Sequence, residues 1–183
     1  MDSQIILKKR VDLIIKEALF CKNNESSFLH LLVISDSVKS LIGIDINNPP
    51  LILLDWIEEG VKNSNKEDYS FDLKKSDVKT ISYKQLQEAL INGNKKSIEG
   101  ILFSLQSLTD GTQLSEFLLE MSLLQTGESF ICIWRISKAM NFAKPKNRFS
   151  FYKLMCRAIL QDTFRKNNSK NKEVSNSLPN KSL

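Results

Sequence analysis

The stretch ESFICIWRISKAMNF, residues 128–142, decides the fold class of this chain. Its apolar residues Phe130, Ile133 and Ile136 recur every three residues, which places them on one face of an α-helix. The strict alternation of apolar and polar residues that is typical of a half-buried strand is absent from the stretch. Residues 128–142 therefore predict an amphipathic helix that packs one apolar face against a core.

The same helical spacing of apolar residues occurs along most of the 183-residue chain. Ser82 and Asn94 are suited to cap the first turn of a helix, and Gly93 is suited to end one. Ser26 or Ser27 is expected to cap a helix that runs to about residue 41. We expect an all-α fold, either an irregular helical bundle or a short αα-hairpin repeat array of about eight helices. The expected helices are residues 3–22, 27–41, 49–60, 82–93, 94–108, 113–127, 128–142 and 148–166.

Composition divides the chain into four parts. Residues 64–80 are polar, mixed in charge and without an apolar stripe. We therefore expect a linker there, between a helical unit of residues 1–63 and a second one of residues 81–166. Residues 167–183 consist mostly of Asn, Ser and Lys and have few side chains to bury. We expect this basic C-terminal tail to be disordered.

Two nine-residue stretches read alike: SFLHLLVIS, residues 27–35, and SFICIWRIS, residues 129–137. They lie 102 residues apart, and the predicted helices before and after each stretch lie at about the same spacing. One interpretation is an internal duplication of a three-helix unit, in which His30 and Cys132 hold equivalent places. The alternative is chance, because amphipathic helices rich in Leu, Ile and Ser resemble one another in composition.

Length and composition argue against several classes of protein. The chain is 42% hydrophobic, which suffices for a packed core. No apolar run approaches the roughly 18–20 residues that a membrane span needs. The first ten residues place an acid before a short apolar run and basic residues after it, unlike a signal peptide. We therefore expect a cytoplasmic protein, or a nuclear one if the source is eukaryotic.

Histidine and cysteine usage argues against a metal or catalytic site. His30 is the only histidine, whereas di-iron bundles use two, and no Cys-x-x-Cys pair is present for zinc. Cys21, Cys132 and Cys156 are scattered among apolar residues, which predicts buried free thiols. We predict no catalytic residue, no metal site and no cofactor. A cysteine–histidine nucleophile pair stays open only through His30.

Five residues are the candidates for a binding site: Trp134, Arg135, Lys138, Trp56 and His30. Trp and Arg are over-represented in binding hot spots. Trp134 lies at the edge of the apolar stripe, beside Arg135 and Lys138, so both core packing and exposure in a groove are open interpretations for it. His30 lies in the apolar run FLHLLV, which is typical of a hydrogen-bonded histidine in the core or at its boundary.

The net charge of +5 is concentrated at the C-terminus, since residues 165–183 hold five basic side chains and one acidic side chain. The rest of the chain is nearly neutral, so a broad basic surface for nucleic acid is not expected. We expect a non-enzymatic helical interaction protein, namely an adaptor, chaperone or regulatory subunit that binds a protein partner. One alternative is a nucleic-acid-associated protein that uses the basic C-terminal region. Another is a helical enzyme or small-ligand binder with a pocket near His30 and Trp134.

Overall fold

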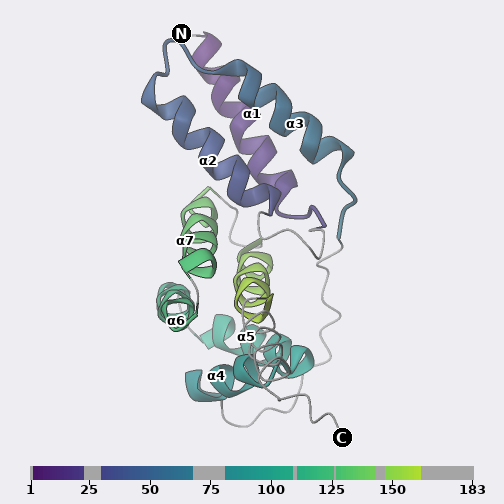
Figure 1. Ribbon diagram of the computed structural model, residues 1–183, viewed down its shortest axis with the longest axis vertical. Helices are drawn as coiled ribbons and strands as arrows, with labels where there is room; N and C mark the ends of the chain where they lie inside the picture. Colours follow the sequence, from purple (N-terminus) through teal and green to yellow (C-terminus); the bar gives the residue numbers. More distant parts are fainter. Residues whose placement is uncertain are drawn as a thin grey trace, which may run out of the picture.

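The computed structural model of the protein describes residues 2–22, 30–67, 81–108, 111–125, 127–142 and 147–161. These residues form eight helices and no β-strand, which confirms the predicted all-α fold (Figure 1). Part of the predicted linker, residues 68–80, and the predicted disordered tail, residues 167–183, lie outside the described residues. The helices are α1 (Asp2–Ala18), α2 (Leu31–Ile44), α3 (Leu51–Asn63), α4 (Tyr83–Ile91), α5 (Lys95–Leu108), α6 (Thr112–Leu123), α7 (Gly127–Met140) and a C-terminal helix over residues 148–161.

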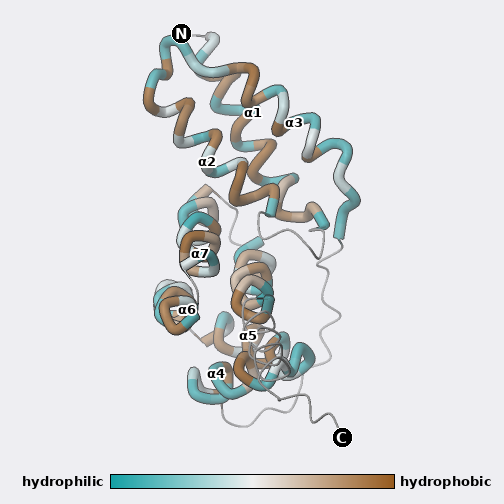
Figure 2. The backbone as a smooth tube through the Cα atoms, in the orientation of Figure 1, coloured by the Kyte–Doolittle hydropathy of each residue, from teal (hydrophilic) through white to brown (hydrophobic). Residues whose placement is uncertain are grey.

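Helices α1, α2 and α3 form a three-helix unit in which each helix contacts the other two (Figure 1). Apolar and polar segments alternate along all three helices, as Figure 2 shows, and this is the pattern of an amphipathic helix. On α1, the residues at helical spacing that face the core are at most 9% exposed: Leu7, Val11, Ile14, Ile15 and Ala18. The apolar stripe of each helix is therefore what holds this unit together.

A surface ion-pair network joins α1 to α3. Arg10 donates hydrogen bonds to Glu58 and Asp55, and the Asp55 contact is 2.7 Å long. These hydrogen bonds raise the pKa of the Arg10 guanidinium above its ordinary value. Because the Asp55 side chain is 66% exposed, water competes with its ion pair, and we expect the pair to contribute little to stability.

Residues 65–67, which follow α3, form hydrogen bonds to the residues just after α1 and to the C-terminal helix. The Lys22 N–H donates to the Asn65 carbonyl at 2.7 Å. The Glu67 N–H donates to the Phe20 carbonyl, also at 2.7 Å. The Glu67 carboxylate accepts two hydrogen bonds from Arg157 of the C-terminal helix, at 2.6 and 2.8 Å. The first residues of the predicted linker thus connect the three-helix unit to the second half of the chain.

The C-terminal helix supplies the largest buried side chains of the second half. Phe151, Tyr152 and Met155 are at most 1% exposed. The Tyr152 hydroxyl donates to the Gly111 carbonyl at 2.9 Å, at the start of α6. Helices α4 and α5 pack on each other, as do α6 and α7. Helix α7 also packs on α2, and this contact joins the two halves.

The caps of α4 and α5 agree with the sequence. The Ser82 hydroxyl accepts a hydrogen bond from the Gln85 N–H, and the Gln85 side chain accepts one from the Ser82 N–H, which together form a capping box. Gly93 has a φ of 68°, a conformation in which glycine ends helices readily. The Asn94 side chain accepts a hydrogen bond from the Ser97 N–H at 3.2 Å. These three predictions are confirmed.

The start of α2 corrects a prediction. We expected Ser26 or Ser27 to cap a helix that runs to about residue 41, but this helix begins at Leu31, ends at Ile44 and has His30 as its N-cap. The His30 side chain accepts the hydrogen bond from the Leu32 N–H that a serine would otherwise accept. The sequence pattern misses this cap because the residues that usually cap helices are Ser, Thr, Asp and Asn.

The two similar stretches hold different places in their helices. Residues 129–137 lie wholly within α7, whereas the first stretch, residues 27–35, enters α2 only at Leu31. His30 is therefore an N-cap, while Cys132 lies inside a helix. The two stretches are similar in sequence, but His30 and Cys132 do not hold equivalent helix positions. The internal duplication stays a hypothesis.

Gly111 gives a test of the contact between the start of α6 and the C-terminal helix. Its φ is 87°, and a Cβ atom added there would lie 2.3 Å from the Tyr152 hydroxyl oxygen. Gly93 also has a positive φ, 68°, but a Cβ atom there would meet nothing within 4 Å. We predict that Gly111→Ala lowers the free energy of unfolding by about 3–4 kcal/mol, and Gly93→Ala by about 1 kcal/mol. Urea denaturation measures both, and equal losses would contradict the tight packing at Tyr152.

Candidate functional site

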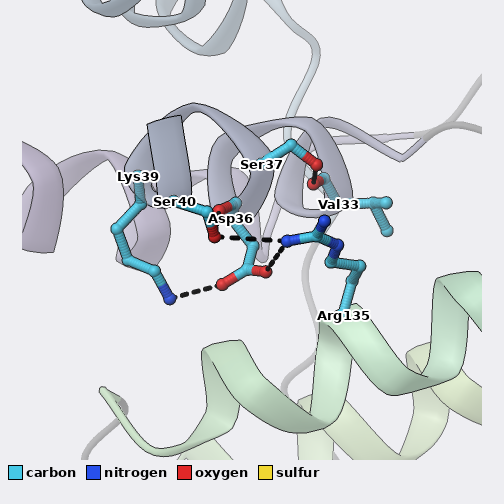
Figure 3. Close-up of polar contacts among 6 residues, drawn as sticks. All are labelled: Val33, Asp36, Ser37, Lys39, Ser40 and Arg135. Carbon is cyan, nitrogen blue, oxygen red and sulfur yellow. Dashed lines mark hydrogen bonds and ion pairs between the residues drawn. The ribbon is translucent and has the colours of Figure 1, made fainter. Parts of the chain in front are cut away.

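A buried carboxylate, Asp36, lies where α2 meets α7 (Figure 3). Its side chain is 0% exposed, although it interrupts the apolar sequence LLVISDSV. Asp36 follows Leu32 by four residues and Val33 by three, so it shares a face of α2 with these two buried side chains. A charge in such a place is tolerated only when it is paired, so the partners of Asp36 determine the chemistry of this contact.

Both oxygens of the Asp36 carboxylate are paired with cations (Figure 3). Arg135 of α7 donates from Nη1 to the Asp36 Oδ2 at 3.1 Å and to the Ser40 hydroxyl at 3.2 Å. Lys39, on the next turn of α2, forms an ion pair with Oδ1. The Arg135 hydrogen bond joins residues that are 99 positions apart, and it connects the two halves of the chain.

Cations also lie over exposed aromatic rings at this contact. The Lys39 Nζ is 4.2 Å from the centroid of the Phe142 ring. The Arg135 guanidinium carbon is 5.0 Å from the centroid of the Trp134 ring, and the Lys138 Nζ is 4.5 Å from it. A cation within about 6 Å of an aromatic face is attracted to it. The buried carboxylate of α2 therefore holds two of these three cations next to the two rings.

Four residues form the outward surface of this region, which we call the α7 outer face: Ile131, Trp134, Lys138 and Phe142. Lys138 lies one helical turn after Trp134, Ile131 lies one turn before it, and Phe142 lies in the turn that ends the helix. Ile131 is 55% exposed, Trp134 41% and Phe142 46%. Exposed apolar side chains that share one helix face offer a surface that a partner can cover.

The structure brings three of the five candidate binding residues together. These are Trp134, Arg135 and Lys138, because the cations of Arg135 and Lys138 both lie over the Trp134 ring. Trp56 is 58% exposed but belongs to α3, which Figure 1 shows well apart from α7. His30 is buried at the start of α2. Trp56 and His30 thus lie outside the α7 outer face.

His30 is 3% exposed, and both of its ring nitrogens are hydrogen-bonded to the backbone. Nδ1 accepts from the Leu32 N–H at 3.1 Å, which assigns the ring proton to Nε2. Nε2 donates to the Cys21 carbonyl at 2.8 Å. Burial lowers the pKa of His30 to about 4. His30 is therefore a neutral imidazole that caps α2 and ties it to the chain after α1.

The space beside His30 is small. His30 and Cys132 line a cavity of about 10 Å³, which is room for about one water molecule. Burial raises the pKa of the Cys156 thiol well above its ordinary value, which disfavours the thiolate that a nucleophile needs. This cavity, which is lined by described residues, is too small for a small-molecule substrate. The hypothesis of a ligand pocket near His30 and Trp134 requires a larger one.

A larger hollow of about 470 Å³ lies on the surface along α4 and α5. It is shallow, and uncharged polar side chains such as Gln85 and Asn92 line it together with Glu88 and Lys96. These two charged residues are of opposite sign, and the side chains of Gln85 and Asn94 already accept hydrogen bonds from backbone N–H groups at the starts of α4 and α5. We therefore assign no ligand to this hollow.

Sequence reasoning missed Lys39, Ile131 and Phe142 at this site, and it also missed the buried Asp36. The available signal was an acid inside an apolar helical stripe, because an acidic residue is almost never buried without a partner. The partner itself, Arg135, could not be found from a local pattern, since it lies 99 residues further along the chain.

No protein-family model, no curated protein and no solved structure matches this chain. In the part of the chain that the structure describes, no group of three His, Cys, Asp or Glu residues is placed to hold a metal ion. Across the same residues, no helix has both the length and the apolar character for a membrane crossing. Function must therefore be inferred from the contact between α2 and α7 and from the surface beside it.

His30 predicts how folding stability depends on pH. The histidine pKa is about 6.5 in the unfolded chain and about 4 in the folded protein, so between these values only the unfolded state binds the proton. The stabilising contribution of neutral His30 is complete above pH 6.5 and is lost as the pH falls toward 4. We predict that the free energy of unfolding falls by about 2 kcal/mol between pH 7 and pH 5.

The control for this prediction is His30→Asn, which can still cap α2 but does not titrate. His30 is the only histidine in the chain, so no other imidazole contributes to the pH dependence. Guanidinium denaturation at several pH values should show a flat profile for the variant between pH 7 and pH 5. The same slope in both proteins would show that His30 is not the group responsible.

The ion pairs of Asp36 predict a contrast with those of Asp55. Asp36→Asn keeps the size of the side chain but removes the charge that faces Arg135 and Lys39, whose side chains are only 24% and 18% exposed. We predict a loss of about 2–3 kcal/mol in the free energy of unfolding. Asp55→Asn removes one charge from the exposed pair with Arg10 and should cost less than about 1 kcal/mol. Urea denaturation at pH 7 compares the two variants, and similar losses would count against a structural role for Asp36.

Proposed function

We propose that the protein is a non-enzymatic helical interaction protein, namely an adaptor, chaperone or regulatory subunit, that binds a protein partner through the α7 outer face. The observation that carries this proposal is the exposure of Ile131, Trp134 and Phe142 on one surface, beside cations that already lie on the rings. Burying this apolar area against a partner is favourable by about 25 cal/mol per Å² before the cost of association.

Trp134 is the natural anchor of such an interface. Tryptophan and arginine dominate binding hot spots, because they combine a large contact area with a polar or charged group. Arg135 and Lys138 lie against the Trp134 ring in the free protein, which restricts the ring and lowers the entropy that binding must remove. Helix α7 is also packed from behind on α2 and α6, so the surface is presented on a supported element.

The nucleic-acid alternative depends on the basic C-terminal region. In its described part, Lys153 pairs with Glu99 at 2.8 Å and Arg157 pairs with Glu67 at 2.6 Å, so these two cations already have carboxylate partners. Residues 165–183, which carry most of the excess charge, lie outside the described residues. The α7 outer face also exposes the aliphatic side chain of Ile131, on which a base cannot stack, and this favours a protein partner.

Affinity capture from a lysate of the source organism tests the proposed function. The wild-type chain, Trp134→Ala and Trp56→Ala serve as baits, and mass spectrometry quantifies what each one recovers. The two substitutions are matched, because both tryptophans are exposed, at 41% and 58%. We predict at least one protein that the wild type and Trp56→Ala recover equally and that Trp134→Ala recovers at least about 10-fold less, since truncating an anchor costs about 2 kcal/mol or more.

Circular dichroism must show that both variants are folded, as expected for exposed positions. Recovery of the same proteins in the same amounts by all three baits would refute a role for the α7 outer face. A partner that is lost only with Trp56→Ala would move the interface to α3.

A further inference from the structure

The charges beside the aromatic rings of the α7 outer face are unbalanced. Three cations, Lys39, Arg135 and Lys138, lie over its aromatic rings. Among the described residues, the carboxylate that pairs with Lys39 and Arg135 is Asp36, and its side chain is 0% exposed. Among the charged side chains that lie over these rings or pair with them, three are positive and the one negative charge is fully buried, so the rim beside the rings is positive.

We propose that the segment of the partner that binds here is an acidic amphipathic helix. This inference rests on the proposed function. The apolar stripe of this helix covers Ile131, Trp134 and Phe142, and carboxylates beside the stripe pair with the three cations. The 12 positions from Ile131 to Phe142 span about 16 Å at a helical rise of about 1.5 Å per residue. This length matches about three turns of a partner helix, the usual unit of helix recognition.

Charge complementarity selects an acidic segment over a basic or an uncharged one. A basic helix would bring further cations against a rim that is already positive, and juxtaposed like charges oppose association. An uncharged apolar helix would remove water from the cations without replacing it by an acceptor, which is also unfavourable. Carboxylates on the partner satisfy the cations while leaving their ring contacts in place.

Asp36 acts in this interface as a positioning residue. Its carboxylate is fully buried and cannot reach a partner. It fixes the ammonium group of Lys39 near Phe142 and the guanidinium group of Arg135 near Trp134. Without it, both long side chains would gain rotamer freedom that binding must then remove. The buried carboxylate therefore prepares the positive rim of the surface.

The experiment uses Trp134 as its own reporter. The chain holds two tryptophans, so Trp56→Phe leaves Trp134 as the sole source of tryptophan fluorescence. The full-length variant is titrated with three synthetic helical peptides of about 14 residues that share a leucine stripe. The peptides carry glutamate, glutamine or lysine at the remaining positions. We predict that the glutamate peptide changes Trp134 emission and binds at least about 10-fold tighter than the glutamine peptide, with a preference that shrinks at high salt.

Charge reversal supplies the matched control. In the same background, Lys138→Glu should abolish the preference for the glutamate peptide, whereas Lys8→Glu should leave it unchanged, because Lys8 is exposed on α1. Asp36→Asn separates positioning from simple charge. This substitution makes the site more positive, so charge alone predicts tighter binding of the glutamate peptide, whereas loss of positioning predicts binding at least about 3-fold weaker. If Asp36→Asn does not fold, Lys138→Glu still tests the proposal.

Four outcomes would overturn the inference, and three of them concern the peptides. These are equal affinity for the glutamate and lysine peptides, no binding of the glutamate peptide at about 1 mM, and unchanged preference after Lys138→Glu. A fourth is tight binding of a single-stranded oligonucleotide that Lys138→Glu removes, which would assign the surface to nucleic acid. The proposed function fails separately, when Trp134→Ala captures the same proteins as the wild type. A partner captured through Trp134 together with a failed peptide preference would therefore refute only the acidic helix.

Discussion

The hydrogen-bonded ion pair between Asp36 and Arg135 is the contact between the two halves of the chain that contains a fully buried charge. It joins α2 of the three-helix unit to α7 of the second half, across 99 residues of sequence. The apolar side chains around it hold the helices together, but apolar contacts are not directional and would tolerate sliding or rotation. A buried ion pair is favourable only while its hydrogen bonds keep their geometry, so our hypothesis is that this pair specifies how α2 and α7 meet. We regard them as a device for specificity more than as a source of net stability.

The same pair connects the interior to the surface. Arg135 and Lys39 both pair with Asp36 (Figure 3). Arg135 also lies over the Trp134 ring, and Lys39 lies over the Phe142 ring. A single buried carboxylate thereby organises an exposed surface of apolar side chains with a positive rim. Contact surfaces in which cations and aromatic rings are already arranged lose less entropy on binding. The arrangement of these cations before binding is the physical basis of the proposed role in protein recognition.

Sequence reasoning reached the architecture because helices are encoded locally. The three-residue spacing of Phe130, Ile133 and Ile136 predicts α7, and Ser82 as an N-cap predicts the start of α4. It missed what depends on partners far along the chain. His30 caps α2 because its second nitrogen finds the Cys21 carbonyl, and Asp36 is buried because Arg135 reaches it. The exposure of Trp134 was left open for a related reason, since a residue at the edge of an apolar stripe is buried or exposed according to which helix packs beside it.

The most direct test of the central claim is a double-mutant cycle on Asp36 and Arg135. The free energy of unfolding is measured for the wild type, Asp36→Asn, Arg135→Met and the double variant at pH 7. If the pair specifies the contact between α2 and α7, the two losses are not additive, and the coupling energy is about 1–3 kcal/mol. Losses that add to within about 0.5 kcal/mol would show that the two side chains act independently and would contradict this account.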